Sequence, residues 1–383
     1  MARTVAILGG GHGAQTLAAD LALAGARVRL FELPEFAPAL AEVFDSGRIE
    51  AHGDILSGTA QLELVTDDLD SAVTDVEVVF VAVPAFAHAR YAQLLGPRVK
   101  GGQLVALLPG TLGTLEMARI WRDCGTDPAV VLAESETLPY ATRALEPGIV
   151  QVYGRTTVQI GVFPATRTEW AVDLLSDLLA VTAARDVLES GFNSLNPVLH
   201  PPGTILNAGR IERSRGQFYI YEEGMTPSVV GVMEALDDER RVLARTFGLE
   251  LPTVAQALHS AGYGPVGSTW EALNGSASLT PIKGPTSLDT RYLSEDIPFG
   301  LVPWSQIGRQ VGVATPVMDA LVTLGQRLLR QPADGPTRTV AALGLDGLDA
   351  EAIVAYVTDG GWAPHLDDLG HRHRLSHHGG AAQ

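Results

Sequence analysis

The chain has 383 residues but a single cysteine, Cys124, so no disulfide bond can form within it. It also lacks an apolar run that approaches the roughly 20 residues needed for a membrane-spanning helix. The apolar run nearest the N-terminus continues directly into a glycine-rich loop, which is not the organisation of a secretory signal peptide. From these absences we expect a cytoplasmic protein that does not enter a membrane.

Positive charge is scarce in this sequence. The 27 Lys and Arg residues are outnumbered by 44 Asp and Glu residues, which gives a formal net charge of −17 at pH 7. Such a surface repels the phosphates of nucleic acids and of anionic lipids, so we expect neither a nucleic acid nor a membrane as partner. Small anions can still bind where a few cationic side chains gather.

Apolar residues make up 46% of the chain, and its length is typical of two domains with separate cores. In the first half, short apolar runs alternate with helical patterns. This alternation predicts an α/β Rossmann domain with a doubly wound parallel sheet. The strand-like runs cover residues 4–8, 27–31, 76–83, 103–108, 130–133 and 158–163, and the helical patterns cover 14–24 and 169–179.

After about Leu188 the pattern becomes helical. Thr226-Pro227 and Thr315-Pro316 are each typical of a helix start, and apolar residues follow both at helical spacing. We therefore predict a dinucleotide-binding domain over residues 1–188 and an all-helical domain over 189–358. Residues 359–383 contain five of the ten histidines, and we expect them to form a disordered tail without a metal site.

The loop between the first predicted strand and the first predicted helix reads G-G-G-H-G-A. Gly9, Gly11 and Ala14 fit the G-x-G-x-x-A fingerprint of dinucleotide-binding domains. Gly9 permits a tight turn, Gly11 lets the backbone approach a pyrophosphate, and Ala14 lets the helix pack closely on the strand. The free N–H groups at the helix start favour the pyrophosphate. His12 and Gly13 complete this cofactor-binding loop, which we expect His12 to order.

Glu32 closes the second predicted strand, about 20 residues beyond the fingerprint. Its carboxylate can accept hydrogen bonds from both hydroxyls of the adenosine ribose and would repel a 2′-phosphate. The sequence therefore favours NAD(H) over NADP(H). FAD binds to the same fold, but the helical second half favours a nicotinamide cofactor.

Val83 and Pro84 lie at the end of another predicted strand, at the sheet edge where open α/β sheets bind their ligands. Pro84 cannot continue a central strand, so the chain turns there. We expect both residues to contact the cofactor. His88 follows shortly afterwards and is expected to begin a helix, although a contact with substrate stays open.

The stretch from Asn193 to Glu212 contains one histidine, His200, which precedes Pro201 and Pro202. Because proline disfavours the helical conformation in its predecessor, we expect His200 to be extended. A fixed imidazole suits general acid–base catalysis, and Asp296 is the candidate for the acid that orients it. The residues alone leave a structural role for His200 equally open.

Taken together, these motifs make the sequence resemble the opine dehydrogenase (octopine/nopaline dehydrogenase) family. The resemblance covers nearly the whole chain up to about Leu345 and is carried by residues 9–14, 81–88, 136–140, 196–212 and 291–300, of which the last two segments are specific to the family. Within the family the chain looks most similar to bacterial members that resemble N-(1-carboxyethyl)-L-norvaline dehydrogenase.

The resemblance implies a Rossmann domain, a helical domain and a cleft between them, with His200 and Asp296 as a catalytic dyad. It implies an NAD(H)-dependent enzyme that joins an amino acid and a 2-oxo acid as an imine and reduces it to an N-(1-carboxyalkyl) amino acid. His200 would then act as acid in reduction and as base in oxidation.

An opine carries two carboxylates, so its binding needs cationic side chains despite the acidic surface. The candidates near the family motifs are Arg143, Arg210, Lys283 and Arg291. We expect Arg143 to bind substrate and Arg291 to bind the pyrophosphate from the helical domain. Asn196, Asn207 and Tyr140, with Thr137, are further candidates for the wall of the substrate and nicotinamide pocket.

Two other functions stay open at this stage. One is a reductase of 2-oxo or 3-oxo acids, because ketopantoate reductase and glycerol-3-phosphate dehydrogenase share this domain plan. The other is a sensor that binds NAD(H) without turnover. A homodimer is the default expectation for the assembly.

Overall fold

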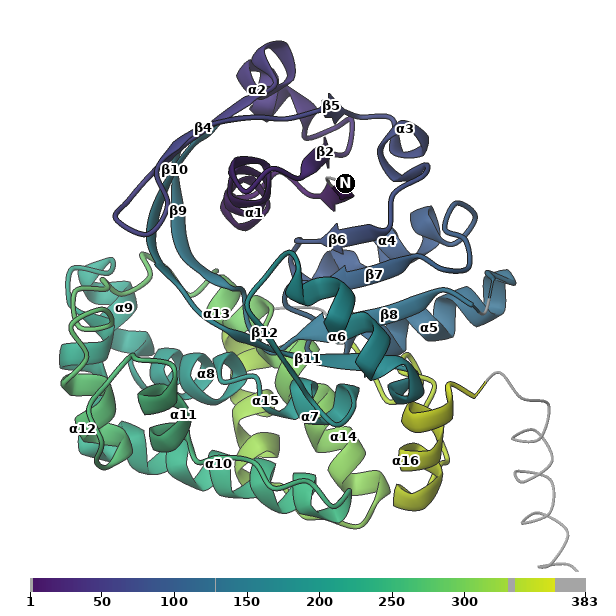
Figure 1. Cartoon of the computed structure of the whole chain (residues 1–383). Coiled ribbons are helices and arrows are strands. Elements are labelled where there is room, and N and C mark those ends of the chain that lie inside the picture. The colour runs from purple at the N-terminus through teal and green to yellow at the C-terminus, as the bar shows by residue number, and fades with distance from the viewer. Residues whose placement is uncertain (1–2, 128, 330–334, 362–383) are drawn as a thin grey trace, which may run out of the picture.

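The computed structural model describes residues 3–127, 129–329 and 335–361, which form a sheet region and a helical region (Figure 1). The five histidines of the predicted tail lie outside these residues. The larger sheet has eight strands in the order β12-β11-β8-β7-β6-β1-β2-β5. Their bounds are β1 (Thr4–Leu8), β2 (Arg27–Phe31), β5 (Leu64–Thr66), β6 (Val78–Val81), β7 (Leu104–Leu107), β8 (Val131–Ser135), β11 (Val158–Phe163) and β12 (Val181–Ala183).

The predicted Rossmann domain is confirmed, with one difference in strand direction. The strands from β5 to β8 are parallel to their neighbours, but β11 runs antiparallel to β8, with Ile160 opposite Ser135. The reason lies in the connection. Between β8 and β11 the chain forms a hairpin instead of the crossover helix that a parallel pair requires.

That hairpin belongs to a second sheet, which the sequence analysis did not predict. Its order is β4-β3-β10-β9, and its strands are β3 (Arg48–His52), β4 (Gly58–Gln61), β9 (Tyr140–Glu146) and β10 (Ile149–Arg155). Pro147-Gly148 lies at the turn between β9 and β10, and Gly148 has a φ of +80°. This Pro-Gly pair between two apolar stretches was the available signal for a hairpin.

Helix α1 (His12–Leu23) lies enclosed between the two sheets, as the arc of β4, β10 and β9 around it shows (Figure 1). Its residues from Gly13 to Leu21 are all buried, which explains its alanine-rich sequence without a polar face. The sheet region also contains the helices α2 (Ala41–Ser46), α3 (Leu69–Val73), α4 (His88–Leu95), α5 (Gly113–Cys124) and α6 (Thr168–Ser176) and the 3₁₀ turns η1 (Ala37–Leu40), η2 (Ala85–Ala87) and η3 (Ala165–Arg167).

The helical region starts at about α7. As the Thr-Pro pairs predicted, α10 begins at Pro227 and α15 at Pro316. Its helices are α7 (Val187–Phe192), α8 (Asn196–Leu206), α9 (Ala208–Ser214), α10 (Pro227–Thr246), α11 (Val254–Ser260), α12 (Thr269–Asn274), α13 (Arg291–Ser294), α14 (Val302–Gln310) and α15 (Pro316–Leu329), with π-helical turns η4 (Ile220–Gly224) and η5 (Ile297–Leu301). Helix α16 (Ala350–Asp359) returns to the sheet region, where Tyr356 packs on Phe163 of β11.

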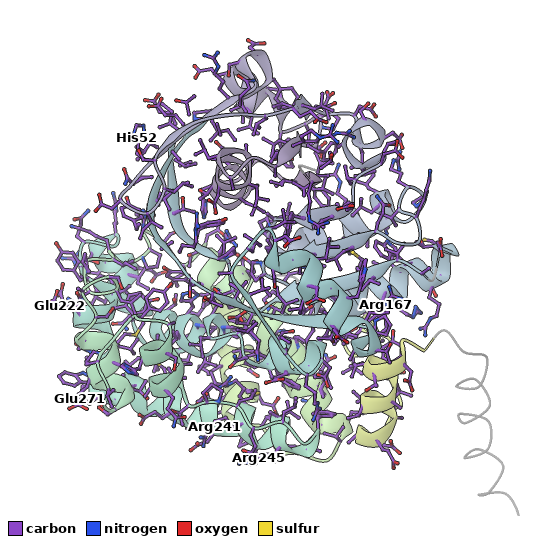
Figure 2. All side chains as sticks on the ribbon, viewed as in Figure 1. His52, Arg167, Glu222, Arg241, Arg245 and Glu271 are labelled. Carbon is purple, nitrogen blue, oxygen red and sulfur yellow. The ribbon has the colours of Figure 1, made fainter. Side chains whose placement is uncertain are left out.

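Two hydrophobic cores follow from the alternation of side chains along the strands. Val5 and Ile7 of β1 face α1 and the second sheet. Ala6 and Leu8 face the opposite way, into a core that continues through α7 to Trp304 of α14. The sheet and helical regions therefore share one continuous core. Charged side chains such as Glu222, Arg245 and Glu271 lie on the outer surface of the helical region (Figure 2).

Among the described residues, no helix has both the length and the apolar character needed to span a membrane.

A buried polar contact ties α1 to the second sheet. The Tyr140 hydroxyl of β9 donates a hydrogen bond to Asp20 Oδ2 of α1 at 2.6 Å, and Arg155 of β10 pairs with the same carboxylate. Both Tyr140 and Asp20 are buried. Breaking such a contact leaves a buried acceptor without its donor.

We expect Tyr140→Phe to lower the free energy of unfolding by about 1–3 kcal/mol, because the buried Asp20 carboxylate loses one of its hydrogen-bond donors. Tyr153→Phe on β10 is the matched control, since Tyr153 is 62% exposed. Urea unfolding of both variants measures the difference. Equal stability of the two variants would contradict the structural role of this hydroxyl.

Candidate active site

A pocket of about 530 Å³ lies where the ends of β6 and β7 meet the helical region. This is the edge of an open α/β sheet at which ligands bind, and the volume suits a small organic ligand. Both regions contribute to its wall, which consists of His12, Ala85, Pro109, Thr111, Thr142, Arg143, Ala144, Asn196, His200, Arg291, Tyr292, Glu295, Asp296, Phe299 and Gly300.

The glycine loop has the geometry that a pyrophosphate requires. Gly9 has a φ of +111°, and a Cβ there would lie 2.7 Å from the Val83 side chain, so no larger residue fits. A Cβ on Gly11 would meet no atom within 4 Å, which leaves the start of α1 open to a ligand. Ala14 is fully buried where α1 packs on the sheet. The loop therefore fits a dinucleotide.

Glu32 follows β2 and is only 8% exposed. Its Oε1 accepts a hydrogen bond from the Leu33 N–H at 2.6 Å. Burial raises the pKa of Glu32, and hydrogen bonds from the N–H groups of Leu33 and Gly10 oppose that rise. Val83 lies against Gly9, and Pro84 precedes the pocket residue Ala85. The position of Glu32 fits the adenosine end of a dinucleotide, and those of Val83 and Pro84 fit its central part.

His200 and Asp296 meet, although 96 residues separate them in the sequence. The two atoms His200 Nδ1 and Asp296 Oδ2 are 2.8 Å apart, and the side chains are 15% and 13% exposed. Burial raises the pKa of Asp296, while the contact with His200 opposes the rise. Because Asp296 engages Nδ1, the other ring nitrogen of this pocket-lining histidine is free for a ligand.

The predicted extended conformation of His200 is wrong, because His200 lies inside helix α8. Pro201 and Pro202 also lie within this helix and are buried. The preference of a residue before proline is a local one, and the burial of α8 from Pro197 to Ile205 outweighs it.

Tyr292 completes the histidine site, although no pattern in the sequence indicated this role. Its ring stacks on the His200 ring, with centroids 4.0 Å apart and an angle of 23° between the planes. Tyr292 lies in α13, four residues before Asp296. One short segment thus supplies both the hydrogen-bond partner and the stacking partner of the imidazole.

Two arginines bring positive charge to the pocket. Arg291 is 56% exposed, and its Nε lies 2.5 Å from Glu295 Oε2. Glu295 Oε1 also accepts a hydrogen bond from the Ala85 N–H at 2.8 Å, which joins the helical region to the end of β6. The pKa of His12 is lowered, first by burial and then by the charges of Arg291 and Arg143. His12, Arg291 and Arg143 therefore face a common space.

The other two cationic candidates lie elsewhere. Arg210 pairs with Glu223 on the surface, and the Lys283 ammonium lies 5.3 Å from the centroid of the Tyr219 ring. Neither residue lines the pocket. His88 begins α4, as predicted, but it is fully buried and does not reach the pocket either.

The structure divides the predicted substrate residues. Asn196 and Arg143 line the pocket. Asn207 does not, because its Nδ2 donates to the carbonyl oxygens of Gly203 and Gly224 at the end of α8. The Tyr140 hydroxyl is bound to Asp20, away from the pocket. Two later residues of the same strand do reach the pocket, since Thr142 and Ala144 of β9 line its wall. Knowledge of the β9 strand would have identified these two residues.

No cluster of three or more His, Cys, Asp or Glu side chains suited to a metal ion occurs in the ranges that the structure describes.

Glu136 follows β8 in the segment E-T-L-P-Y, and its Oε2 accepts a hydrogen bond from the Gln159 N–H at 2.7 Å. Burial raises the pKa of Glu136 from 4.5 to about 7. Between these pH values the folded protein holds a proton that the unfolded chain has released. The contribution of Glu136 to the free energy of unfolding therefore falls as the pH rises through this window.

Glu136→Gln stays neutral and keeps an oxygen for Gln159. On going from about pH 5 to about pH 8, we expect the wild type to lose about 1–3 kcal/mol of unfolding free energy more than the variant. Urea unfolding at the two pH values checks this, with Glu146→Gln, an exposed carboxylate on β9, as control. A parallel pH response of Glu136→Gln and wild type would show that Glu136 is ionised throughout.

Comparison with known proteins supports the same picture as the geometry. Residues 183–329 match the family model described as NAD/NADP octopine/nopaline dehydrogenase, alpha-helical domain. The chain is 38% identical over 355 residues to the opine dehydrogenase of Arthrobacter sp. (strain 1C), covering 92% of this chain and 98% of the relative. It is 28% identical to the vitopine synthase of Allorhizobium ampelinum, covering 91% and 98%.

The solved structure of an octopine dehydrogenase in complex with NADH and agmatine has the same fold. Its TM-score is 0.75 at 23% sequence identity, and the match covers 92% of this chain and 98% of the other. In this chain a pocket lies between a dinucleotide fingerprint and a buried histidine–aspartate pair. The same chain matches the Arthrobacter opine dehydrogenase almost end to end. The chain belongs to the opine dehydrogenase family of oxidoreductases.

Proposed function

We propose that this enzyme uses NADH to join an amino acid and a 2-oxo acid through an imine into an N-(1-carboxyalkyl) amino acid. The observation that carries the proposal is the pair of His200 Nδ1 and Asp296 Oδ2 at 2.8 Å in a pocket bordered by the glycine loop and two arginines. We extend the cofactor preference and the substrate class to this chain from its family and from its own residues.

The dinucleotide would be held mainly by the sheet region, for which we propose the division at residue 188. Gly9, Gly11 and the first turn of α1 would hold the pyrophosphate, and Glu32 the adenosine ribose. Arg291 is half-exposed opposite this loop and can bind the pyrophosphate from the helical side. When bound, the nicotinamide supplies the hydride that reduces the imine carbon.

His200 would donate the proton that the nitrogen of the product needs, and in the reverse direction it would accept that proton. Asp296 holds Nδ1, which leaves the second ring nitrogen to exchange the proton in the pocket. The carboxylate of Asp296 also stabilises the charged imidazolium. Stacking on Tyr292 limits rotation of the ring, so the proton is exchanged at a defined point.

The two substrates together bring two carboxylates to the pocket. Arg143 and Arg291 are the cations placed to bind them, and Asn196 can donate and accept hydrogen bonds beside His200. The pocket lies between two regions of the fold, and closure of these regions over the substrates would exclude water. This matters because an imine hydrolyses readily in water. A homodimer and a cytoplasmic location stay predictions from the sequence.

The direct test is a grid of amino acids against 2-oxo acids, followed by the loss of NADH absorbance. We expect oxidation only where an amino acid and a 2-oxo acid are both present. Oxidation with a 2-oxo acid alone would identify a hydroxy-acid-forming reductase instead. Binding of NADH without oxidation in any well would favour a sensor.

We expect His200→Ala to lower kcat by about 10²- to 10⁴-fold, because the proton donor is lost, while NADH still binds. His259→Ala is the control, since His259 is an exposed histidine on α11. Steady-state kinetics and NADH fluorescence titration provide the two measurements. Retention of full activity in His200→Ala would exclude the proposed dyad.

Glu32→Gln removes the negative charge that would repel a 2′-phosphate. We expect the ratio of kcat/KM for NADH over NADPH to fall by about tenfold or more, mainly through improved use of NADPH. Glu35→Gln is the neighbouring control, since Glu35 is exposed and pairs with Arg90. An unchanged ratio in Glu32→Gln would show that Glu32 does not face the ribose.

A further inference from the structure

Arg338 is a fully buried cation that the proposed chemistry does not use. It lies between α15 and α16, in the part of the chain that returns from the helical region to the sheet region. Its Nε and one terminal nitrogen bind Glu116 Oε2 of α5 at 3.0 and 2.9 Å. A buried ion pair of this kind costs desolvation energy and is weak evidence for added stability. The role of Arg338 therefore has to follow from its other contacts.

The guanidinium also binds the two loops that form the floor of the pocket. Its terminal nitrogens donate to the carbonyl oxygens of Gly110 at 3.2 Å, Thr111 at 2.7 Å and Ala85 at 3.4 Å. The contact with His88 Nδ1 is 3.0 Å. The pKa of His88 is well below its usual range because of burial and of the Arg338 charge, so this neutral imidazole can accept the hydrogen bond.

On the other side, Arg338 reaches the segment that carries Asp296. Its backbone N–H donates to the Pro298 carbonyl oxygen at 3.0 Å. The guanidinium carbon lies 5.3 Å from the centroid of the Phe299 ring. Phe299 lines the pocket three residues beyond Asp296, together with Ala85 and Thr111. Arg338 thus contacts the pocket wall from both regions at once.

One of the loops held by Arg338 is strained. Thr111 and Leu112 have φ values of +51° and +66°, which residues with a side chain rarely adopt. Glu134 accepts a hydrogen bond from the Leu112 N–H at 2.8 Å, and Arg338 donates to the Thr111 carbonyl oxygen. Such a conformation persists only when its surroundings enforce it, and here the side chains of Glu134 and Arg338 both bind the turn.

We propose that Arg338 is a positioning residue that fixes the nicotinamide end of the active site against the segment of Asp296. The proposal rests on the proposed function, since Ala85 and Thr111 lie in the loops that follow β6 and β7 and line the same pocket as His200 and Asp296. A lysine cannot replace the guanidinium, because the guanidinium nitrogens together bind Glu116, His88 and the carbonyl oxygens of Gly110 and Thr111, and a single ammonium cannot reach all of these acceptors.

The chain offers a matched control in Arg240 of α10, which is equally buried. Its guanidinium pairs with Asp237 at 2.7 Å and donates to the carbonyl oxygens of Phe192 and Pro252 at 2.8 Å each. Arg240 does not line the pocket. Arg338→Lys and Arg240→Lys therefore remove comparable buried contacts, in one case beside the pocket and in the other away from it.

The experiment compares wild type with both variants in NADH titration, ADP-ribose titration and steady-state kinetics, after thermal unfolding has shown that each is folded. ADP-ribose contains the adenosine and pyrophosphate but no nicotinamide. For Arg338→Lys we expect kcat to fall by about 10²-fold and NADH binding to weaken by about tenfold, with ADP-ribose binding unchanged. For Arg240→Lys we expect lower stability with unchanged kinetic and binding constants.

Equal weakening of NADH and ADP-ribose in Arg338→Lys, or equal kinetic losses in both variants, would overturn the proposal. If Arg338→Lys does not fold, Glu116→Gln against Asp237→Asn makes the same comparison with the arginines in place, and there too the absence of a selective loss of NADH binding overturns it. A wild type that binds NADH but reduces no substrate pair counts against the proposed function, while the binding measurements still decide the role of Arg338.

Discussion

The desolvation of one carboxylate, that of Asp296, sets the main requirement on this active site. A buried carboxylate is costly unless a partner compensates its charge, and burial raises the pKa of Asp296 accordingly. His200 is the partner at 2.8 Å. The contact forms only if the helix that carries the histidine and the segment that carries the acid are held in fixed register, so the packing around them has to be rigid.

The fold meets this requirement through the continuity of its core. Helices α7, α8 and α14 pack into the same hydrophobic cluster as one face of the large sheet, where the Phe192 ring stacks on Phe247 and packs at a tilt against Trp304. Polar contacts then connect the segment around Asp296 to the sheet edge, through Glu295 and the Ala85 N–H. Each region alone would leave half of the pocket wall missing.

Much of this could be predicted from the sequence, where short-range patterns carry the information. The glycine loop, Glu32 and most strands of the large sheet follow from local turns and apolar runs, and the Thr-Pro starts of α10 and α15 do too. Asp296 was a candidate partner of His200 from the residues, and the family resemblance implied the pair, because spacing alone cannot show contact between residues 96 positions apart. The structure supplies the distance.

The rest depends on contacts that no local pattern reveals. The prolines after His200 indicated an extended segment, yet burial keeps α8 helical. Tyr140 was a candidate for the pocket wall because it ends the family segment 136–140, but its hydroxyl donates a hydrogen bond to Asp20 of α1 instead. Arg338 lies 222 residues from its partner Glu116. Nothing in its sequence neighbourhood distinguishes it from a surface arginine.

The acidic composition and the anionic ligands of the family are compatible because charge acts over different distances. The net charge of −17 acts mainly across the solvent, where salt screens it beyond about 8 Å. Inside the pocket the nearby charges decide, and Arg143 and Arg291 both act on His12 there. Arg291 is already paired with Glu295. An anion must therefore compete with that carboxylate, which favours ligands whose charge is high and whose geometry matches the guanidinium, such as a pyrophosphate, over weakly bound inorganic ions.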